Sequence, residues 1–122
     1  MSNIINLVGN NNRLVFDLGE HQLVFIPTDE RSKAVTEKAN DLKKRSENIN
    51  EDDEWVARKA IKELIDEIFT TMFDEDAPRK IYQAAGENTW SYLKIFMKIS
   101  ETVKQEQQKQ LNDEEFKKYL AE

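Results

Sequence analysis

The sequence predicts an α+β fold that is predominantly helical, with an N-terminal β-hairpin or three-strand meander packed on three to five helices. Three observations support this prediction. Runs rich in β-branched residues occur only before Pro27. Beyond Pro27, apolar residues recur at spacings of three and four, which is the pattern of an amphipathic helix. Three glycines and two prolines in 122 residues are too few for the many tight turns of a β-sandwich or barrel.

The β part is expected in residues 1–27. A short apolar run over 4–8 ends in a Gly-Asn-Asn-Asn stretch, and a brief glycine-containing link joins two further runs, 13–18 and 21–26. Two such runs with a short link are the signal of a hairpin. A sheet of two or three strands is marginal alone, so it must lay one face on helices. The residues expected on that face are Leu14, Phe16, Leu18, Leu23 and Phe25.

A first helix is expected from Thr28 or Asp29 to about Asn48, because either residue can accept a hydrogen bond from the N–H groups at a helix start. Its apolar positions are few, so this helix is expected to cover the core rather than form it. These positions are Val35, Ala39, Leu42 and Ile49.

The segment 52–73 has the clearest helical periodicity of the chain and begins in a run of acidic residues typical of a helix start. Its apolar residues form one wide face, which makes it the expected core helix. That face consists of Val56, Ala60, Ile61, Leu64, Ile65, Ile68, Phe69 and Met72. If it is buried, replacing Leu64 or Ile68 by alanine costs about 2–5 kcal/mol.

Two more helices are expected towards the C-terminus. Asp76 and the proline two residues later favour the start of a short helix over 78–85, and Gly86 can supply its left-handed stop. A long helix then opens at Asn88 or Thr89. The apolar side predicted for it consists of Trp90, Leu93, Phe96, Met97, Ser100 and Val103.

The length leaves room for one hydrophobic core. Residues 1–103 are therefore expected to form a single compact domain, in which 1–27 are β and 28–103 are helical. From residue 104 the helical pattern becomes polar all round, so 104–122 are expected to form a polar C-terminal helical tail.

The net charge of −6 is concentrated in residues 51–76, which carry ten acidic and three basic side chains. A nucleic-acid binder needs clustered Lys and Arg, and only the short run over 43–45 resembles such a cluster, so no nucleic-acid partner is expected. The longest apolar runs have about four residues, far short of the roughly 20 that cross a bilayer. The N-terminus also lacks the pattern of a signal peptide. We therefore expect no membrane partner and a cytoplasmic location.

The residue types that carry most enzyme chemistry are scarce. The chain has no cysteine and one histidine, His21, which lies between polar residues at a strand edge. The acidic runs are explained by helix capping. Asp74 begins a stretch like a calcium loop, but Arg79 and Ala85 stand where that loop needs glycine and glutamate. We expect no catalytic residue, no cofactor, no metal and no enzymatic activity.

The remaining expectation is that the protein binds partners through its surface. Trp55 and Trp90 each lie in the first turn of a predicted helix. The simpler interpretation is that they make core or capping contacts, and the alternative is that they anchor a protein partner. The C-terminal stretch bears a small apolar cluster that can dock on this chain or on another. The candidate partner-binding residues are Trp90, Phe96, Met97, Phe116, Tyr119 and Leu120.

The layout resembles one known family. An F-D-L-G and L-V-F-I-P hairpin leads into a charged helix, and the core helix contains Lys-Glu-Leu-Ile-Asp-Glu-Ile-Phe at 62–69. An acidic break, a short helix through 80–82 and a long helix with a Gln/Glu/Lys-rich tail follow. This order is similar to that of the small tail assembly chaperones of long-tailed phages and prophages of Gram-positive bacteria, over roughly residues 13–103. Thr70 and Thr71 replace a glycine that often follows the Ile-Phe pair in that family.

The resemblance implies a non-enzymatic helper in the cytoplasm of the bacterial host. Such proteins coat the tape measure protein, which is the first expected partner, and bring the tail tube protein, the second, to polymerise around it. No binding residue is carried over from the family. The alternative is an acidic phage-encoded inhibitor that mimics nucleic-acid charge on a host protein, and a third is an unrelated small regulatory or structural subunit. A homo-oligomer is compatible with each.

Overall fold

The computed structural model describes residues 13–50 and 52–111. The predicted strand over 4–8 and the candidate binding residues Phe116, Tyr119 and Leu120 lie outside the described residues. Within them, the predicted α+β, predominantly helical fold is confirmed. A two-stranded antiparallel sheet is followed by four helices, in the order β1 (Leu14–Asp17), β2 (Gln22–Phe25), α1 (Asp29–Ser46), α2 (Glu54–Met72), α3 (Ala77–Ala84) and α4 (Thr89–Leu111).

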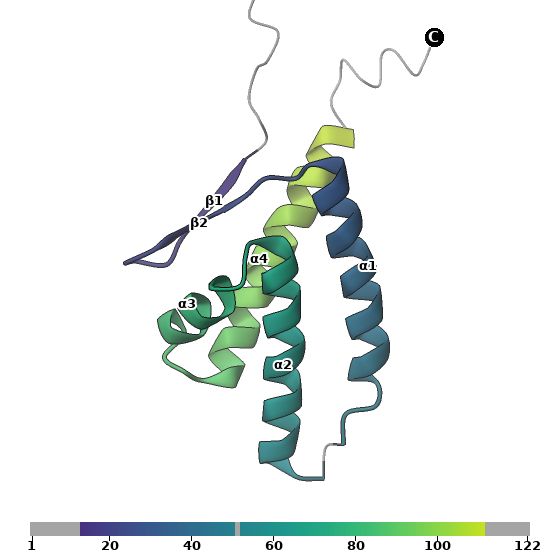
Figure 1. Cartoon of the computed structure of the whole chain (residues 1–122), viewed down its shortest axis with the longest axis vertical. Coiled ribbons are helices and arrows are strands. Elements are labelled where there is room, and N and C mark those ends of the chain that lie inside the picture. Colours follow the sequence, from purple (N-terminus) through teal and green to yellow (C-terminus); the bar gives the residue numbers. More distant parts are fainter. Residues whose placement is uncertain (1–12, 51, 112–122) are drawn as a thin grey trace, which may run out of the picture.

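The helices are arranged around α2. Helix α1 packs beside α2 and runs antiparallel to it, while α4 packs on α2 and runs in the same direction (Figure 1). The short α3 joins α2 to α4 and contacts both. The hairpin lies near the end where α2 finishes and α1 begins (Figure 1).

The hairpin follows the predicted alternation. Leu14 pairs with Phe25, and Phe16 with Leu23, so four apolar side chains share one face. Gly19 closes the turn at φ +92°, which is accessible to glycine at little cost, and its N–H donates to an Asp17 carboxylate oxygen at 2.8 Å. The inward face rests on Phe73, whose ring meets Phe16 and Phe25 edge to face with centroids 6.1 and 6.2 Å apart.

Side chains that the sequence offers as caps begin the long helices. The Thr28 hydroxyl accepts from the N–H of Arg31 at 3.0 Å at the start of α1. An Asp53 carboxylate oxygen accepts from two N–H groups of α2. Asn88 caps α4 in the same way, through the N–H of Ser91 at 3.1 Å. At α3 the cap differs from the prediction, because Asp76 forms no capping bond and Asp74 accepts from the N–H groups of residues 76 and 77 instead.

The core gathers on one face of α2, where the aromatic ring of Phe69 is fully buried among the rings of Phe73, Tyr92 and Phe96. Two details of the predicted faces are wrong. Val56 is 55% exposed, and Ala57 is buried in its place. The most deeply buried apolar residues of α4 are Tyr92, Ile99 and Val103, of which only Val103 was placed on its apolar side.

Arg31 ties the start of α1 to the end of α2. Its guanidinium donates to the backbone carbonyl oxygens of Thr71, Met72 and Phe73 at 3.2, 2.8 and 3.1 Å. The last carbonyls of a helix have no partner within the helix and carry partial negative charge. A part-buried cation with several N–H donors therefore suits this position.

Glu67 forms the centre of an ion-pair cluster between α1 and α2. Arg45 reaches it through two hydrogen bonds of 2.6 and 2.9 Å, and the ammonium of Lys38 lies 3.5 Å away. Hydrogen bonds from Arg45, with a further contribution from the charge of Lys38, lower the pKa of Glu67 from its ordinary 4.5, against the opposing effect of burial. The carboxylate is thus stabilised in its charged form by the folded state.

The Glu67 cluster predicts a pH-dependent stability. Because the pKa of Glu67 is lowered by folding, its contribution is complete above the ordinary value of 4.5 and is lost as the pH falls through the lowered value. We expect Glu67→Gln to destabilise the protein at neutral pH and the difference from the wild type to vanish in acid, as measured by urea unfolding across the pH range. Glu63→Gln, at an exposed position of the same helix, is the control. A difference between wild type and Glu67→Gln that is independent of pH would contradict the assignment.

Candidate protein-binding groove

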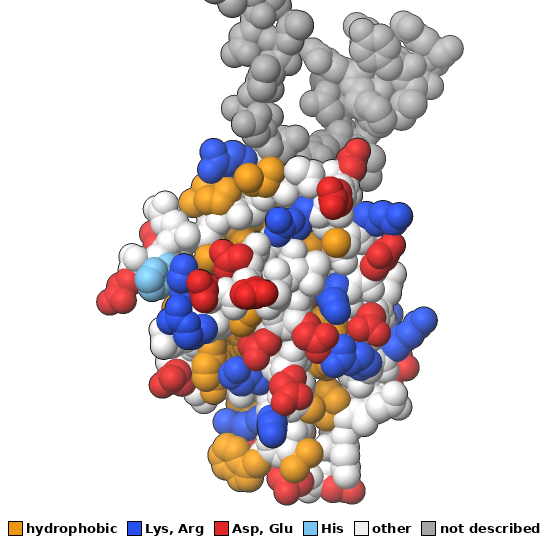
Figure 2. Space-filling model, in the orientation of Figure 1, with side chains coloured by type: hydrophobic (Ala, Val, Ile, Leu, Met, Phe, Trp, Pro, Cys, Tyr) orange, Lys and Arg blue, Asp and Glu red, His pale blue; other side chains and the backbone are white. Residues whose placement is uncertain are grey.

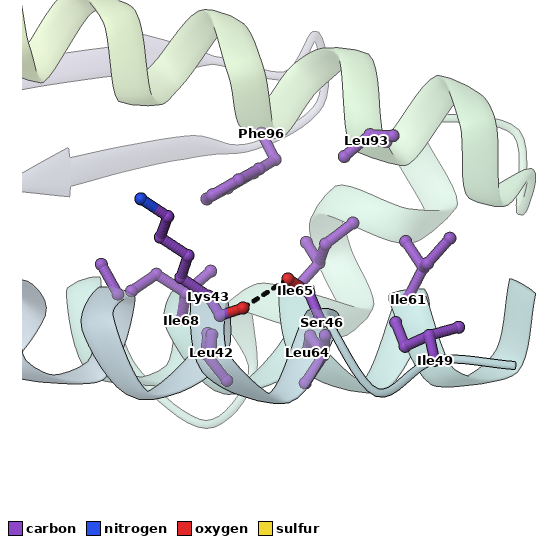
Figure 3. A pocket seen from close by; sticks show the side chains of 11 residues that line it. Leu42, Lys43, Ser46, Ile49, Ile61, Leu64, Ile65, Ile68, Leu93 and Phe96 are labelled. Atoms are coloured by element: carbon purple, nitrogen blue, oxygen red, sulfur yellow. Dashed lines mark hydrogen bonds between the residues drawn. The ribbon is translucent and has the colours of Figure 1, made fainter. Parts of the chain in front are cut away.

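An apolar groove opens between α1 and α4, with α2 as its floor. Both outer helices pack on α2, and between them lies a pocket of about 370 Å³ (Figure 3). Figure 3 shows Leu93 and Phe96 pointing from α4 towards the aliphatic side chains of the other two helices. The lining consists of Ala39, Leu42, Lys43, Ser46, Ile49, Ile61, Leu64, Ile65, Ile68, Leu93 and Phe96.

The groove follows from the composition of its walls. Helix α1 has few apolar residues, so it covers only part of the wide apolar face of α2 and leaves Ile61 and Leu64 half-buried. Helix α4 carries two apolar stripes rather than one. Tyr92 and Ile99 face the core, while Leu93 and Phe96 are half-buried along the groove. The Ser46 hydroxyl, the polar group of α1 at this wall, donates to the Lys43 carbonyl oxygen at 2.6 Å.

The groove continues past both ends of this pocket. Towards the start of α2 it extends over Ala57 and Ile61 and reaches Trp90 and Glu54, in a further hollow of about 360 Å³. In the other direction Phe96 leads to Met97 and to the polar turns of α4, where Glu101 and Lys104 line a third hollow. These hollows share lining residues, Ile61 between the first two and Phe96 between the first and the third, and we call them together the α1–α4 groove. The described lining of the third hollow comes from α4 alone. Measured along α4, Trp90 to Lys104 correspond to about 21 Å at the usual rise per residue.

Both tryptophans of the chain lie at the end of the α1–α4 groove where α2 begins. The guanidinium of Arg58 lies over both indole rings, 4.8 Å from the centroid of Trp55 and 5.4 Å from that of Trp90. An Arg58 nitrogen also lies 3.0 Å from a Glu54 carboxylate oxygen. Trp55 is 69% exposed and Trp90 39% exposed. Exposed Trp and Arg that hold one another in place are typical of the anchor points of protein interfaces.

A part-buried polar network links α4 to α2 behind the groove. The Tyr92 hydroxyl donates to an Asp66 carboxylate oxygen at 2.6 Å, and the Lys62 ammonium lies 3.0 Å from the other oxygen. Burial, followed by the hydrogen bond with Asp66, raises the pKa of Tyr92 well above its ordinary value. The phenol therefore stays protonated, and the network serves to position the two helices.

No group of three or more His, Asp or Glu side chains that could hold a metal ion occurs in residues 13–50 and 52–111. In the same part of the chain, no helix is long and apolar enough to cross a membrane. His21 is exposed next to the hairpin turn, outside the groove.

Three of the six candidate binding residues fall within the described chain, and all three line the α1–α4 groove. Trp90 lies at one end, Phe96 in the middle, and Met97, 58% exposed, just beyond it. Sequence reasoning did not identify Arg58 or the α1 wall. The spacing of Trp55 and Arg58 by three residues on one helix was an available signal, whereas the meeting of Arg58 with Trp90 depends on the packing of α2 against α4.

The fold and the groove together define a small helix-rich α+β protein with an open apolar groove between two of its helices. This kind of surface is the one on which proteins bind amphipathic helices. The chain belongs to the family of unknown function DUF6673, whose model matches residues 10–122. Comparison with curated proteins and with solved structures finds no match.

Proposed function

We propose that this protein is a non-enzymatic tail assembly chaperone of a phage or prophage, and that it binds a helical segment of the tape measure protein in the α1–α4 groove. The tail tube protein is the second proposed partner, and the cytoplasm of the bacterial host is the place of action. The proposal that the protein binds a helical segment rests on the α1–α4 groove. The identity of the partner rests on the resemblance of the sequence to that class of chaperones.

The groove has the features that a helix-binding site needs. Its lining is mostly aliphatic and aromatic along α2 and both walls, and its length of about 21 Å suits a helix of about 14 residues at the usual rise per residue. Half-buried apolar side chains that a partner can cover are a source of binding free energy. A long client with amphipathic helical segments would be kept from aggregating by such a cover.

The alternative of an acidic inhibitor that mimics nucleic acid has less support from the surface. On the face formed by α1 and α2, Lys and Arg alternate with Asp and Glu (Figure 2). Several of these charges are paired with one another, as in the cluster around Glu67. A mimic of the phosphate backbone requires a continuous field of one sign, which this face does not present.

The groove predicts a direct effect of one added charge on client binding. Met97→Glu places a carboxylate at the exposed apolar edge of the α1–α4 groove, and we expect at least a tenfold loss of affinity for the tape measure protein encoded by the same genome. This loss of affinity is measured by co-purification of the co-expressed proteins and by titration with a soluble fragment of the tape measure protein. Suppression of client precipitation should fall in parallel.

Val15→Glu is the matched control. Val15 is 55% exposed, close to the 58% of Met97, but it lies on the hairpin and lines none of the groove. Its affinity for the client should equal that of the wild type. Equal affinities for both variants would place client binding elsewhere, and no co-purification of the wild-type pair would reject the proposed function.

A further inference from the structure

The charges that line the α1–α4 groove differ between its two ends. At the end where α2 begins, Glu54 lines the groove and follows Asp52 and Asp53, both exposed. Arg58 is the one cation contacting Glu54 there among the described residues. This end is therefore acidic and is bordered by the exposed ring of Trp55.

The remainder of the groove carries more positive than negative charge. Lys43 extends from α1 towards α4 in the central pocket (Figure 3). Further along, Lys104 and Glu101 line the last hollow, and Glu101 accepts a hydrogen bond from Gln105 at 3.3 Å. No ion pair within the described chain involves Lys43 or Lys104. A bound helix thus meets acidic groups at one end and cations from its middle onwards.

The chain already contains a helix that packs on α2 beside the groove, namely α1, which forms one of its walls. Helix α1 has Asp29 and Glu30 in its first turn and three basic residues, 43–45, in its last turn, and it runs antiparallel to α2 (Figure 1). This charge order is also the one that the helix dipole favours, with anions at the N-terminus and cations at the C-terminus. An occupant of the same polarity would lie antiparallel to both α2 and α4.

We propose that the groove selects an amphipathic helix by polarity: the partner helix lies antiparallel to α2, and its last turn carries Lys or Arg residues that meet Asp52, Glu54 and the Trp55 ring. A cation there is attracted by the carboxylates and by the face of the indole. The first turn of the partner is acidic and meets Lys104, while Lys43 faces the middle of the partner helix. This inference rests on the proposed use of the groove and adds the direction and charge order of the partner.

Two synthetic peptides test the polarity. Both have 18 residues, the same composition without tryptophan, one Leu/Ala face and a hydrocarbon staple that equalises their helix content. One has glutamates in its first turn and lysines in its last turn, and the other has these charges exchanged. The only two tryptophans of the protein, Trp55 and Trp90, border the acidic end, so their fluorescence reports binding there. We expect at least fivefold tighter binding of the first peptide in low salt, and a smaller preference as salt screens the charges.

A variant of the full chain makes the test specific. Asp52→Lys/Glu54→Lys changes two exposed side chains and keeps the helix cap Asp53, so we expect it to fold and to reverse the preference between the two peptides. Glu63→Lys, at an exposed position of α2 outside the groove, should keep the wild-type preference. Folding of each variant is checked by circular dichroism.

Equal affinities of the two peptides, the opposite preference, or binding of neither peptide would overturn the proposed polarity. So would a preference that Asp52→Lys/Glu54→Lys leaves unchanged. These outcomes are independent of the Met97→Glu experiment, since a tape measure protein that binds in a Met97-dependent manner would still support the proposed function.

Discussion

Phe69→Ala is expected to lower the free energy of unfolding by about 3–5 kcal/mol, the range typical for truncating a buried aromatic side chain. The Phe69 side chain is fully buried, and its ring centroid lies 5.6 Å from that of Tyr92 and 5.8 Å from that of Phe96. Its removal leaves a cavity where α2 packs on α4, next to Phe73, the residue on which the hairpin rests. Urea unfolding followed by circular dichroism measures the loss.

Thr70→Ala is the control for this position, because Thr70 is the next residue of α2 and is exposed. Among the described residues, its hydroxyl bonds only to the carbonyl oxygen of Asp66 in its own helix. We expect a change within about 0.5 kcal/mol, as for most surface substitutions. A Phe69→Ala protein as stable as Thr70→Ala would contradict the described core.

Arg31→Ala is expected to have the second largest effect on stability, about 1.5–3 kcal/mol, the usual range for hydrogen bonds that involve a charged group. The variant leaves the carbonyl oxygens of Thr71, Met72 and Phe73 without their shared donor. These groups are part-buried, so water replaces the guanidinium incompletely. Thermal and urea unfolding measure the loss.

Two further variants test whether the geometry of the guanidinium matters. Arg31→Lys keeps the charge but offers one compact ammonium, so we expect it to recover only part of the lost stability. Lys33→Ala removes an exposed cation two residues away, whose ion pair with Glu37 is long at 4.0 Å, and should be nearly neutral. If Arg31→Ala were as stable as Lys33→Ala, the three carbonyl contacts would contribute nothing measurable.

The sequence was sufficient to predict the order and approximate limits of the described elements, because strong local signals mark them. The glycine link between two alternating runs predicted the hairpin, and Thr28 and the acids before residue 54 predicted the starts of α1 and α2. The buried side of α4 was harder to predict. Apolar residues occur around much of its circumference, and only the packing on Phe69 selects Tyr92 rather than Trp90 for the core.

The α1–α4 groove could be predicted only in part. Trp90, Phe96 and Met97 were proposed as partner-binding residues, and each lines the α1–α4 groove. The opposite wall depends on how far α1 stands from α4, which is a tertiary property. The sparse apolar stripe of α1, around Leu42, predicted a helix that covers the core, but it did not predict that an opening would remain beside this helix.

Helix α4 continues for about two turns beyond its last buried residue among those described. After Val103, the side chains from Lys104 to Lys109 are exposed, apart from a half-buried Glu106, although the backbone stays helical to Leu111. Helical turns with exposed side chains are held mainly by their own backbone bonds, so they can fray and re-form while the remainder of the described chain stays folded. A partner that binds this end of α4 can therefore order it without straining the hydrophobic core.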